Sequence, residues 1–292
     1  MRYRRPAAIL AACVAVAASA VAAGAGAPER AGSREQRAIG GGPGGGSSGP
    51  RATGLGSPSI ARFVDARRFG RSGGGRALVT SAFGSVRAAE NRVLVVACIH
   101  GTECAGAAVT RLIPRGCPPT HADVWTVPDL NPDGHRLGVR VNGRGVDLNR
   151  NFAAGWRPIG RRGDPEYSGP RPFSEPETRA ARSLIARIRP AVTIWYHQGE
   201  GPYVRAWGPS VPAARRYARA AGLPFRAMPW LAGTGPQWQN RSFPGTSSFV
   251  VELPVGKLPA GSAQRHAAAV ELLAGYRGVT RLGLRRSARG RN

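Results

Sequence analysis

The chain has 292 residues, of which 42% are apolar, so it can bury a substantial core without disulfides or metal ions, and disorder throughout is excluded. Its formal net charge of +26, from 42 basic and 16 acidic residues, would usually indicate a nucleic-acid or polyanion partner. However, residues 59–276 hold 29 basic and 14 acidic residues, and much of the excess lies in the two ends. Lys257 is the only lysine, a bias that GC-rich codon usage also produces. We therefore expect no specific nucleic-acid partner.

The N-terminus has the pattern of an export signal. Arg2, Arg4 and Arg5 precede an almost purely apolar stretch at 7–23, and small residues follow as candidate cleavage sites. The stretch is rich in alanine and only weakly hydrophobic, so we expect no transmembrane span in the mature protein. Residues 1–27 are predicted to be a signal peptide of a secreted or envelope-associated protein. Lipidation at Cys13 is the alternative.

Residues 28–58 are Gly, Ser, Pro and Arg with few apolar side chains, and they predict a disordered linker. Residues 59–276 form the predicted folded domain, and 277–292 form a basic C-terminal tail. Three cysteines remain after signal cleavage, which allows at most one intramolecular disulfide, and the sequence does not select the pair. These are Cys98, Cys104 and Cys117.

Short β-branched apolar runs alternate with helical patterns along residues 59–276. This alternation predicts an α/β fold, a mixed and mostly parallel twisted sheet with helices on both faces. Ser174 is the predicted N-cap of one helix, with Pro176 in its first turn and Glu177 at the capping-box position. The predicted strands are 76–83, 92–99, 123–130, 191–198 and 247–253. The predicted helices are 104–113, 174–188, 213–221 and 262–276.

Candidate metal ligands follow two of the predicted strands. His100 and Glu103 come directly after the buried run 93–99, and Gly101 between them allows a tight turn. His197 ends the run 192–197. Side chains at strand ends of an α/β sheet gather at one edge. Two histidines and one glutamate are the ligand set of a hydrolytic zinc site that keeps one position open.

Further polar segments lie at strand ends or within strands. The segment 140–152 holds Asp, Asn and Arg close together in the sequence. Glu252 lies within a β-branched apolar strand, where a buried carboxylate is costly unless it is paired or functional. In this order, the motifs resemble those of the M14 family of zinc metallocarboxypeptidases. The motifs are HGTE (100–103), NPDG (131–134), RVNGRGVDLNRNF (140–152), YH (196–197) and VVEL (250–253).

The resemblance implies a role for each matching residue. It implies one zinc ion held by His100, Glu103 and His197, with Glu252 as the general base toward a zinc-bound water. Arg140 would stabilise the oxyanion, while Asn149 and Arg150 would bind the terminal carboxylate of the substrate. A guanidinium offers a carboxylate two parallel hydrogen bonds, which suits Arg150. Asp147 is expected to orient a ligand histidine or one of these arginines.

Within the family, residues 235–254 are most similar to the murein peptide amidases. The expected substrate is therefore the D-γ-glutamyl–meso-diaminopimelate bond of cell-wall peptides, with the anionic wall as a possible partner. No tyrosine lies between Tyr217 and Tyr276, where the digestive carboxypeptidases carry one, and Trp230 and Trp238 occupy the stretch. Gln237 and Arg241 are the candidates for a residue that sets substrate specificity.

Three alternatives stay open at this stage. The first is a carboxypeptidase that removes C-terminal residues from ordinary peptides. The second is the aspartoacylase branch, which resembles the HGTE and DLNR pieces but usually lacks the Asp-Gly of NPDG. The third, from a different class, is a basic wall-binding protein with a vestigial zinc site. The presence of all three ligands and of Glu252 argues against the third.

Overall fold

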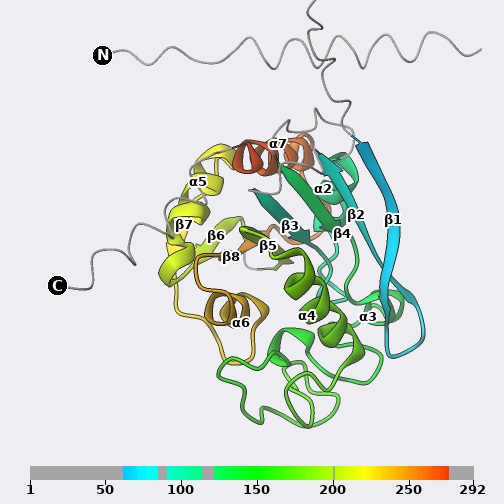
Figure 1. Ribbon diagram of the computed structural model, residues 1–292. Coiled ribbons are helices and arrows are strands. Elements are labelled where there is room, and N and C mark those ends of the chain that lie inside the picture. The colour runs from blue at the N-terminus through cyan, green and yellow to red at the C-terminus, as the bar shows by residue number, and fades with distance from the viewer. Residues whose placement is uncertain (1–61, 85–90, 114–121, 200, 276–292) are drawn as a thin grey trace, which may run out of the picture. The chain divides into compact units, whose positions relative to one another are not determined.

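One mixed eight-stranded sheet organises the computed structural model, which describes residues 62–84, 91–113, 122–199 and 201–275 (Figure 1). The strand order is β1-β2-β4-β3-β5-β8-β6-β7. The central strands β4, β3, β5 and β8 are parallel, and antiparallel pairs occur toward both edges. The strands are β1 (Arg62–Arg71), β2 (Ala77–Gly84), β3 (Arg92–Val96), β4 (Asp123–Val127), β5 (Val192–Gln198), β6 (Tyr203–Ala206), β7 (Phe225–Ala227) and β8 (Ser247–Leu253).

The central strands are buried at nearly every position because both faces of the sheet are covered. Successive side chains of a strand point to opposite faces. In β3, Val93 and Val95 enter one hydrophobic core, while Leu94 and Val96 enter the other. The predicted α/β class with a mixed, mostly parallel sheet is confirmed.

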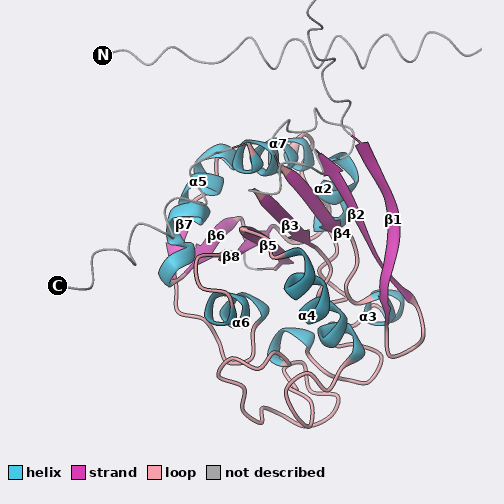
Figure 2. Ribbon diagram, in the orientation of Figure 1, coloured by secondary structure: helices cyan, strands magenta, loops and turns pink. Residues whose placement is uncertain are grey.

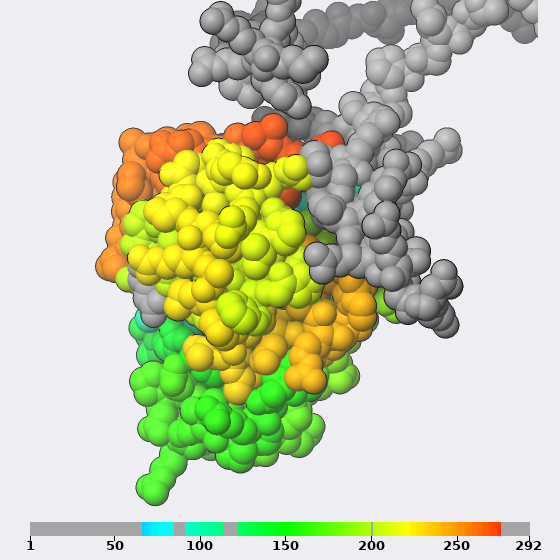
Figure 3. Space-filling view, turned by 90° about the vertical axis from the view of Figure 1, so that its left-hand side faces the viewer, coloured from blue at the N-terminus to red at the C-terminus, as the bar shows by residue number. Residues whose placement is uncertain are grey.

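Helices pack against both faces, as predicted (Figure 2). The first core includes α2, α5 and α7, and the second includes α4 and α6. Figure 3 shows the side of the molecule on which α5 lies, in yellow. This helix packs against β6 and β7. The helices are α2 (Gly106–Leu112), α3 (Pro132–Leu137), α4 (Pro176–Ile188), α5 (Val211–Ala221), α6 (Gly235–Ser242) and α7 (Ser262–Ala274), with 3-10 turns η2 (Leu148–Arg150) and η3 (Gly208–Ser210).

The sequence did not indicate β1, β6, β7, α3 or α6, and one helix start was wrong. Glu175, not Ser174, is the N-cap of α4, and no side chain caps that end. Ser174 Oγ donates to Glu175 Oε1 instead. Glu177 accepts from Gly73 N and from Asn142 Nδ2, so it does not close a capping box. Pro176 does occupy the first turn.

Several predictions lie outside the described residues. These concern the signal peptide, the linker, the basic tail and Cys117. The described residues fall in the unit Ile60–Asn292, one of two into which the chain divides. In the described part of the chain, no helix has both the length and the apolar character that crossing a bilayer requires.

Candidate active site

The parallel pairing of β3, β5 and β8 brings the strand-end residues together. His197, near the end of β5, is the register partner of Glu252 in β8. His100 and Glu103 lie in the loop that leaves the neighbouring strand β3. All four line one cavity of about 330 Å³. The sheet itself therefore places the predicted general base beside the predicted ligands.

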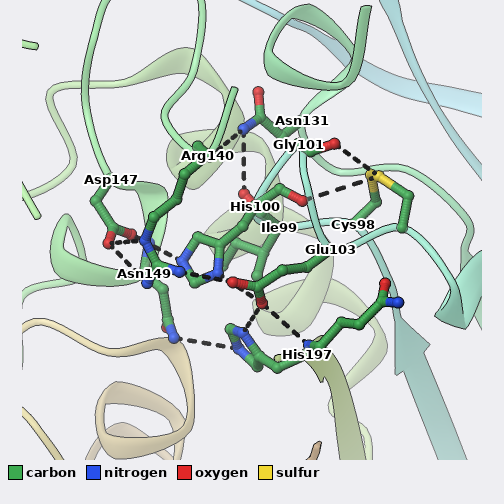
Figure 4. A network of polar contacts seen from close by, with 12 residues as sticks. Cys98, Ile99, His100, Gly101, Glu103, Asn131, Arg140, Asp147, Asn149 and His197 are labelled. Carbon is green, nitrogen blue, oxygen red and sulfur yellow. Dashed lines mark hydrogen bonds and ion pairs between the residues drawn. A yellow bond between two sulfur atoms is a disulfide. The ribbon is translucent and has the colours of Figure 1, made fainter. Parts of the chain in front are cut away.

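The three predicted ligands meet around one point (Figure 4). Glu103 Oε2 lies 2.9 Å from His100 Nδ1 and 2.9 Å from His197 Nδ1. One ligand atom from each residue lies within 4.8 Å of the other two, and all three residues are buried. His100 reaches this point from the loop after β3, and His197 from the end of β5.

This group fits a zinc ion. Zinc binds nitrogen and oxygen at about 2.0–2.1 Å in tetrahedral sites, which separates neighbouring ligand atoms by roughly 3.3 Å. His100 Nδ1 is buried and lies 2.9 Å from Glu103 Oε2, but it makes no well-aligned hydrogen bond within the described residues, so its lone pair can face a cation. One further group of possible ligands occurs among the described residues, Cys98, Cys104 and His135. Its two cysteines are joined in a disulfide and offer no thiolate.

Asp147 supports the ligand group from behind. It is fully buried, and its Oδ1 lies 3.0 Å from His100 Nε2. This contact favours a proton on Nε2 and leaves Nδ1 free to bind a metal ion. Asp147 also caps η2 by accepting from Asn149 N at 2.8 Å. Asp147 therefore holds His100 in the orientation that a metal ligand needs.

The site is a coupled set of charges. Burial opposes protonation of His100, but Asp147 and Glu103 outweigh burial and raise its pKa. Burial alone would raise the pKa of Glu103, yet His100 and His197 hold that pKa far below its usual range. The pKa of Asp147 is likewise lowered against burial, by His100, Arg140 and Arg150. Both carboxylates are therefore ionised at neutral pH.

Arg140 lies between two of these carboxylates. Its Nη1 donates to Glu103 Oε1 at 2.6 Å, and its Nη2 donates to Asp147 Oδ2 at 3.2 Å. Its side chain is 30% exposed and also lines the cavity. The predicted contact with an oxyanion is compatible with this position and stays a prediction.

Asn149 and Arg150 also line the cavity but already have protein partners. Asn149 Nδ2 lies 3.2 Å from His197 Nε2, and its Oδ1 accepts from Gly235 N at 3.0 Å. Arg150 Nη2 donates to the exposed Glu166 at 2.6 Å. Asn149 therefore contacts the His197 ring as a donor, whereas Asp147 contacts the His100 ring as an acceptor. That Asn149 and Arg150 bind the substrate carboxylate stays a prediction.

Arg205 is a cavity residue that the sequence did not reveal. It is the register partner of Val250, two residues from Glu252 in β8, so both side chains belong to the same face of the sheet. Among the described residues no carboxylate pairs with Arg205, and its Nε is buried without a hydrogen-bond partner. Its guanidinium lies 5.7 Å from the Trp230 ring centre, and its Nη2 donates to Pro229 O.

The two residues expected to set specificity do not line the cavity. Neither Gln237 nor Arg241 belongs to its wall, and their role in specificity stays a prediction. The start of α6 instead contributes Thr234 and Pro236 to the wall. Of the two tryptophans that occupy the stretch without tyrosine, Trp230 lines the cavity. Trp238 packs against aromatic side chains in the core.

The structure also selects a cysteine pair. Cys98 and Cys104 form a disulfide with a Cα–Cα distance of 4.3 Å. Both ligands from the HGTE segment lie between the two cysteines in the sequence. The pairing that the sequence left open is therefore settled for these two residues.

Comparison with known proteins agrees with this geometry. The family model described as zinc carboxypeptidase, Peptidase M14, matches residues 119–235. Murein peptide amidase A of Escherichia coli K12 is 35% identical over 144 residues, which are 44% of this chain and 57% of that protein. Carboxypeptidase B of Astacus astacus is 26% identical over 109 residues, which are 30% of this chain and 36% of that protein. The chain thus spans little more than half of the amidase and about a third of the carboxypeptidase.

Solved structures extend the similarity over more of the chain. A murein-tripeptide amidase of Escherichia coli O157 superposes with a TM-score of 0.60 and 27% identity, covering 72% of this chain and 92% of that one. A carboxypeptidase A of Helicoverpa armigera gives a TM-score of 0.61 at 18% identity, covering 77% of this chain and 69% of that one. The second match concerns the fold alone.

Proposed function

We propose that this chain, as a member of the M14 family of zinc carboxypeptidases, hydrolyses an amide bond in peptides with one zinc ion. One observation carries the proposal: His100, Glu103 and His197 converge beside Glu252 in a single cavity. A vestigial site would have no reason to keep the ligands, their supporting partners and a carboxylate in the adjacent register.

The proposed roles follow from where the groups lie. When bound, zinc supplies a Lewis acid that polarises the scissile carbonyl and lowers the pKa of a water molecule toward 7. Glu252 would take a proton from the attacking water on a carboxylate oxygen and deliver it to the nitrogen of the leaving amine. Arg140 would face the negative charge that develops on the carbonyl oxygen, which lowers the barrier more than it strengthens substrate binding.

We further propose that the substrate is a murein peptide cleaved at the D-γ-glutamyl–meso-diaminopimelate bond. Three arginines line the cavity, Arg140, Arg150 and Arg205, and such a peptide carries several carboxylates. Arg140 and Arg150 already have carboxylate partners, which leaves Arg205 to receive one from the substrate. The similarity to the two amidases supports the same substrate.

A carboxypeptidase that acts on ordinary C-terminal residues is the second candidate, favoured by the zinc carboxypeptidase match. A substrate panel separates the two. Mass spectrometry would follow L-Ala-γ-D-Glu-meso-diaminopimelate and a set of blocked dipeptides with aliphatic, aromatic, basic and acidic C-termini. We expect cleavage of the tripeptide with release of diaminopimelate. Cleavage of the blocked dipeptides with the tripeptide untouched would refute the murein assignment.

Export belongs to this proposal because murein peptides of the cell wall lie outside the cytoplasmic membrane. The basic and apolar pattern of residues 1–27 supports it. The basic excess of the chain would favour a salt-dependent attraction to an anionic wall. Intact-mass measurement of the protein in the culture medium, the envelope and the cell interior tests export. A chain that retains residues 1–27 and stays inside the cell would refute it.

A further inference from the structure

We propose that the Cys98–Cys104 disulfide is a positioning element of the metal site, which holds His100 and Glu103 in the geometry that zinc requires. The proposal rests on the metal site inferred above, and it assigns to these cysteines a role beyond stabilising the fold. Figure 4 shows the disulfide beside the loop that carries both ligands.

The disulfide closes a small ring around two of the three ligands. β3 ends at Val96 and α2 begins at Gly106, so residues 97–105 connect a strand to a helix on one face of the sheet. Cys98 and Cys104 lie six residues apart in sequence, and their Cα atoms are only 4.3 Å apart. His100 and Glu103 therefore lie inside a covalent ring, whereas His197 comes from the regular strand β5.

Backbone contacts fix the first half of this ring. Asn131 N donates to Cys98 O at 3.0 Å, and Asn131 Nδ2 donates to Ile99 O at 3.3 Å. Gly101 N donates to Arg140 O at 3.1 Å, and a side chain at Gly101 would overlap the backbone of α3. The backbone on both sides of His100 is thus held by the segments around α3 and Arg140.

The second half of the ring has fewer anchors. Glu103 N donates to His100 O within the ring, and Thr102 is exposed. The Glu103 carboxylate contacts other polar groups of the site, but these contacts act on the side chain rather than on the backbone. Cys104 follows Glu103 directly, and its bond to the fully buried Cys98 ties this half to the end of β3. The disulfide therefore fixes Glu103 more than His100.

Small displacements of a ligand matter for a metal ion. Functional groups must be held to within about 0.5 Å of their productive positions, and loss of groups that orient metal ligands typically lowers metal affinity 10- to 100-fold. A disulfide that only stabilised the fold would change the unfolding temperature but not the zinc affinity of the folded protein. These two consequences can be measured separately.

The test compares the full chain with Cys98→Ser/Cys104→Ser, and uses Cys117→Ser as a matched control that removes a cysteine outside this ring. Zinc affinity is measured by competition with a chromophoric chelator, at a temperature where circular dichroism shows each metal-free protein folded. We expect zinc binding 10- to 100-fold weaker in the double variant and unchanged within about twofold in Cys117→Ser. If the double variant does not fold, Cys104→Ala, which alters a half-buried side chain, replaces it.

Equal zinc affinity in the disulfide variant and the wild type would overturn the proposal, whatever happens to the unfolding temperature. In that case the proposed function would stand, because the wild type would still hold zinc. A wild-type protein that binds no zinc would overturn the proposed function together with this inference.

Discussion

Replacing Asp147 with Asn tests how far the metal site depends on the residue that orients His100. The carboxylate is fully buried and contacts three partners: His100 Nε2 at 3.0 Å, Asn149 N at 2.8 Å and the Arg140 guanidinium at 3.2 and 3.3 Å. An amide keeps only one accepting oxygen, and its NH₂ group would face the donors of His100 or Arg140. The substitution therefore removes the charge and at least one hydrogen bond, and leaves a buried donor unpaired.

The magnitude follows from these contacts. A hydrogen bond that involves a charged group is worth about 1.5–3 kcal/mol, and breaking a buried ion pair costs about 3–5 kcal/mol. We expect Asp147→Asn to lower the free energy of unfolding of the metal-free protein by about 3 kcal/mol. Because His100 loses the acceptor that orients it, zinc affinity should also fall 10- to 100-fold.

Two assays on the same protein separate these effects. Urea denaturation of the metal-free form gives the unfolding free energy, and chelator competition gives the zinc dissociation constant. Asp133→Asn is the matched control, since Asp133 is also buried and ion-paired, with Arg76 at 2.6 Å, but contacts no candidate ligand. It should destabilise the fold and leave zinc affinity unchanged. Unaltered zinc affinity in Asp147→Asn would refute the supporting role.

Two further predictions concern the cavity and pH. Arg205→Ala should raise KM for the murein tripeptide roughly 10- to 100-fold, because one hydrogen bond to a charged group is worth about 1.5–3 kcal/mol. The control Arg226→Ala should leave KM unchanged, since the Arg226 guanidinium stacks on Tyr203 and does not line the cavity. A KM for Arg205→Ala equal to that of the wild type would show that Arg205 does not bind the substrate. Burial and Arg265 lower the pKa of His266 to about 4. Between pH 6.5 and 4 only the unfolded chain therefore binds a proton at this residue. The free energy of unfolding should fall by about 1.4 kcal/mol per pH unit as the pH drops through this range. Urea titrations should show this slope reduced in His266→Gln, and an identical slope in both proteins would contradict it.

The sequence was informative where physical requirements are local. A strand covered on both faces is mostly apolar, so β3, β5 and β8 were recognisable from their composition. The edge strand β1 carries several arginines, and β6 and β7 have only four and three residues, so none of the three showed a clear pattern. The core strands were therefore predictable, although β3 and β4 each end three residues before the predicted 92–99 and 123–130, and the edge strands were not predictable.

The site divides in the same way. His100, Glu103 and His197 could be selected because their residue types stand at strand ends, and the structure brings them together. Arg205 enters the cavity only through the antiparallel register of β6 with β8, which local sequence does not encode. The Cys98–Cys104 pair likewise depends on how tightly the loop after β3 turns back. Residues that require long-range pairing were therefore the ones missed.

The central claim is that one zinc ion held by His100, Glu103 and His197 acts together with Glu252 in amide hydrolysis. The most direct test measures zinc content and diaminopimelate release for the wild type and for Glu252→Gln, which keeps the shape of the side chain but cannot accept a proton. We predict one zinc per chain in both proteins, release by the wild type that stops on chelation and returns with zinc, and loss of release in Glu252→Gln. Undiminished release by Glu252→Gln, or release by the wild type without metal, would contradict the claim.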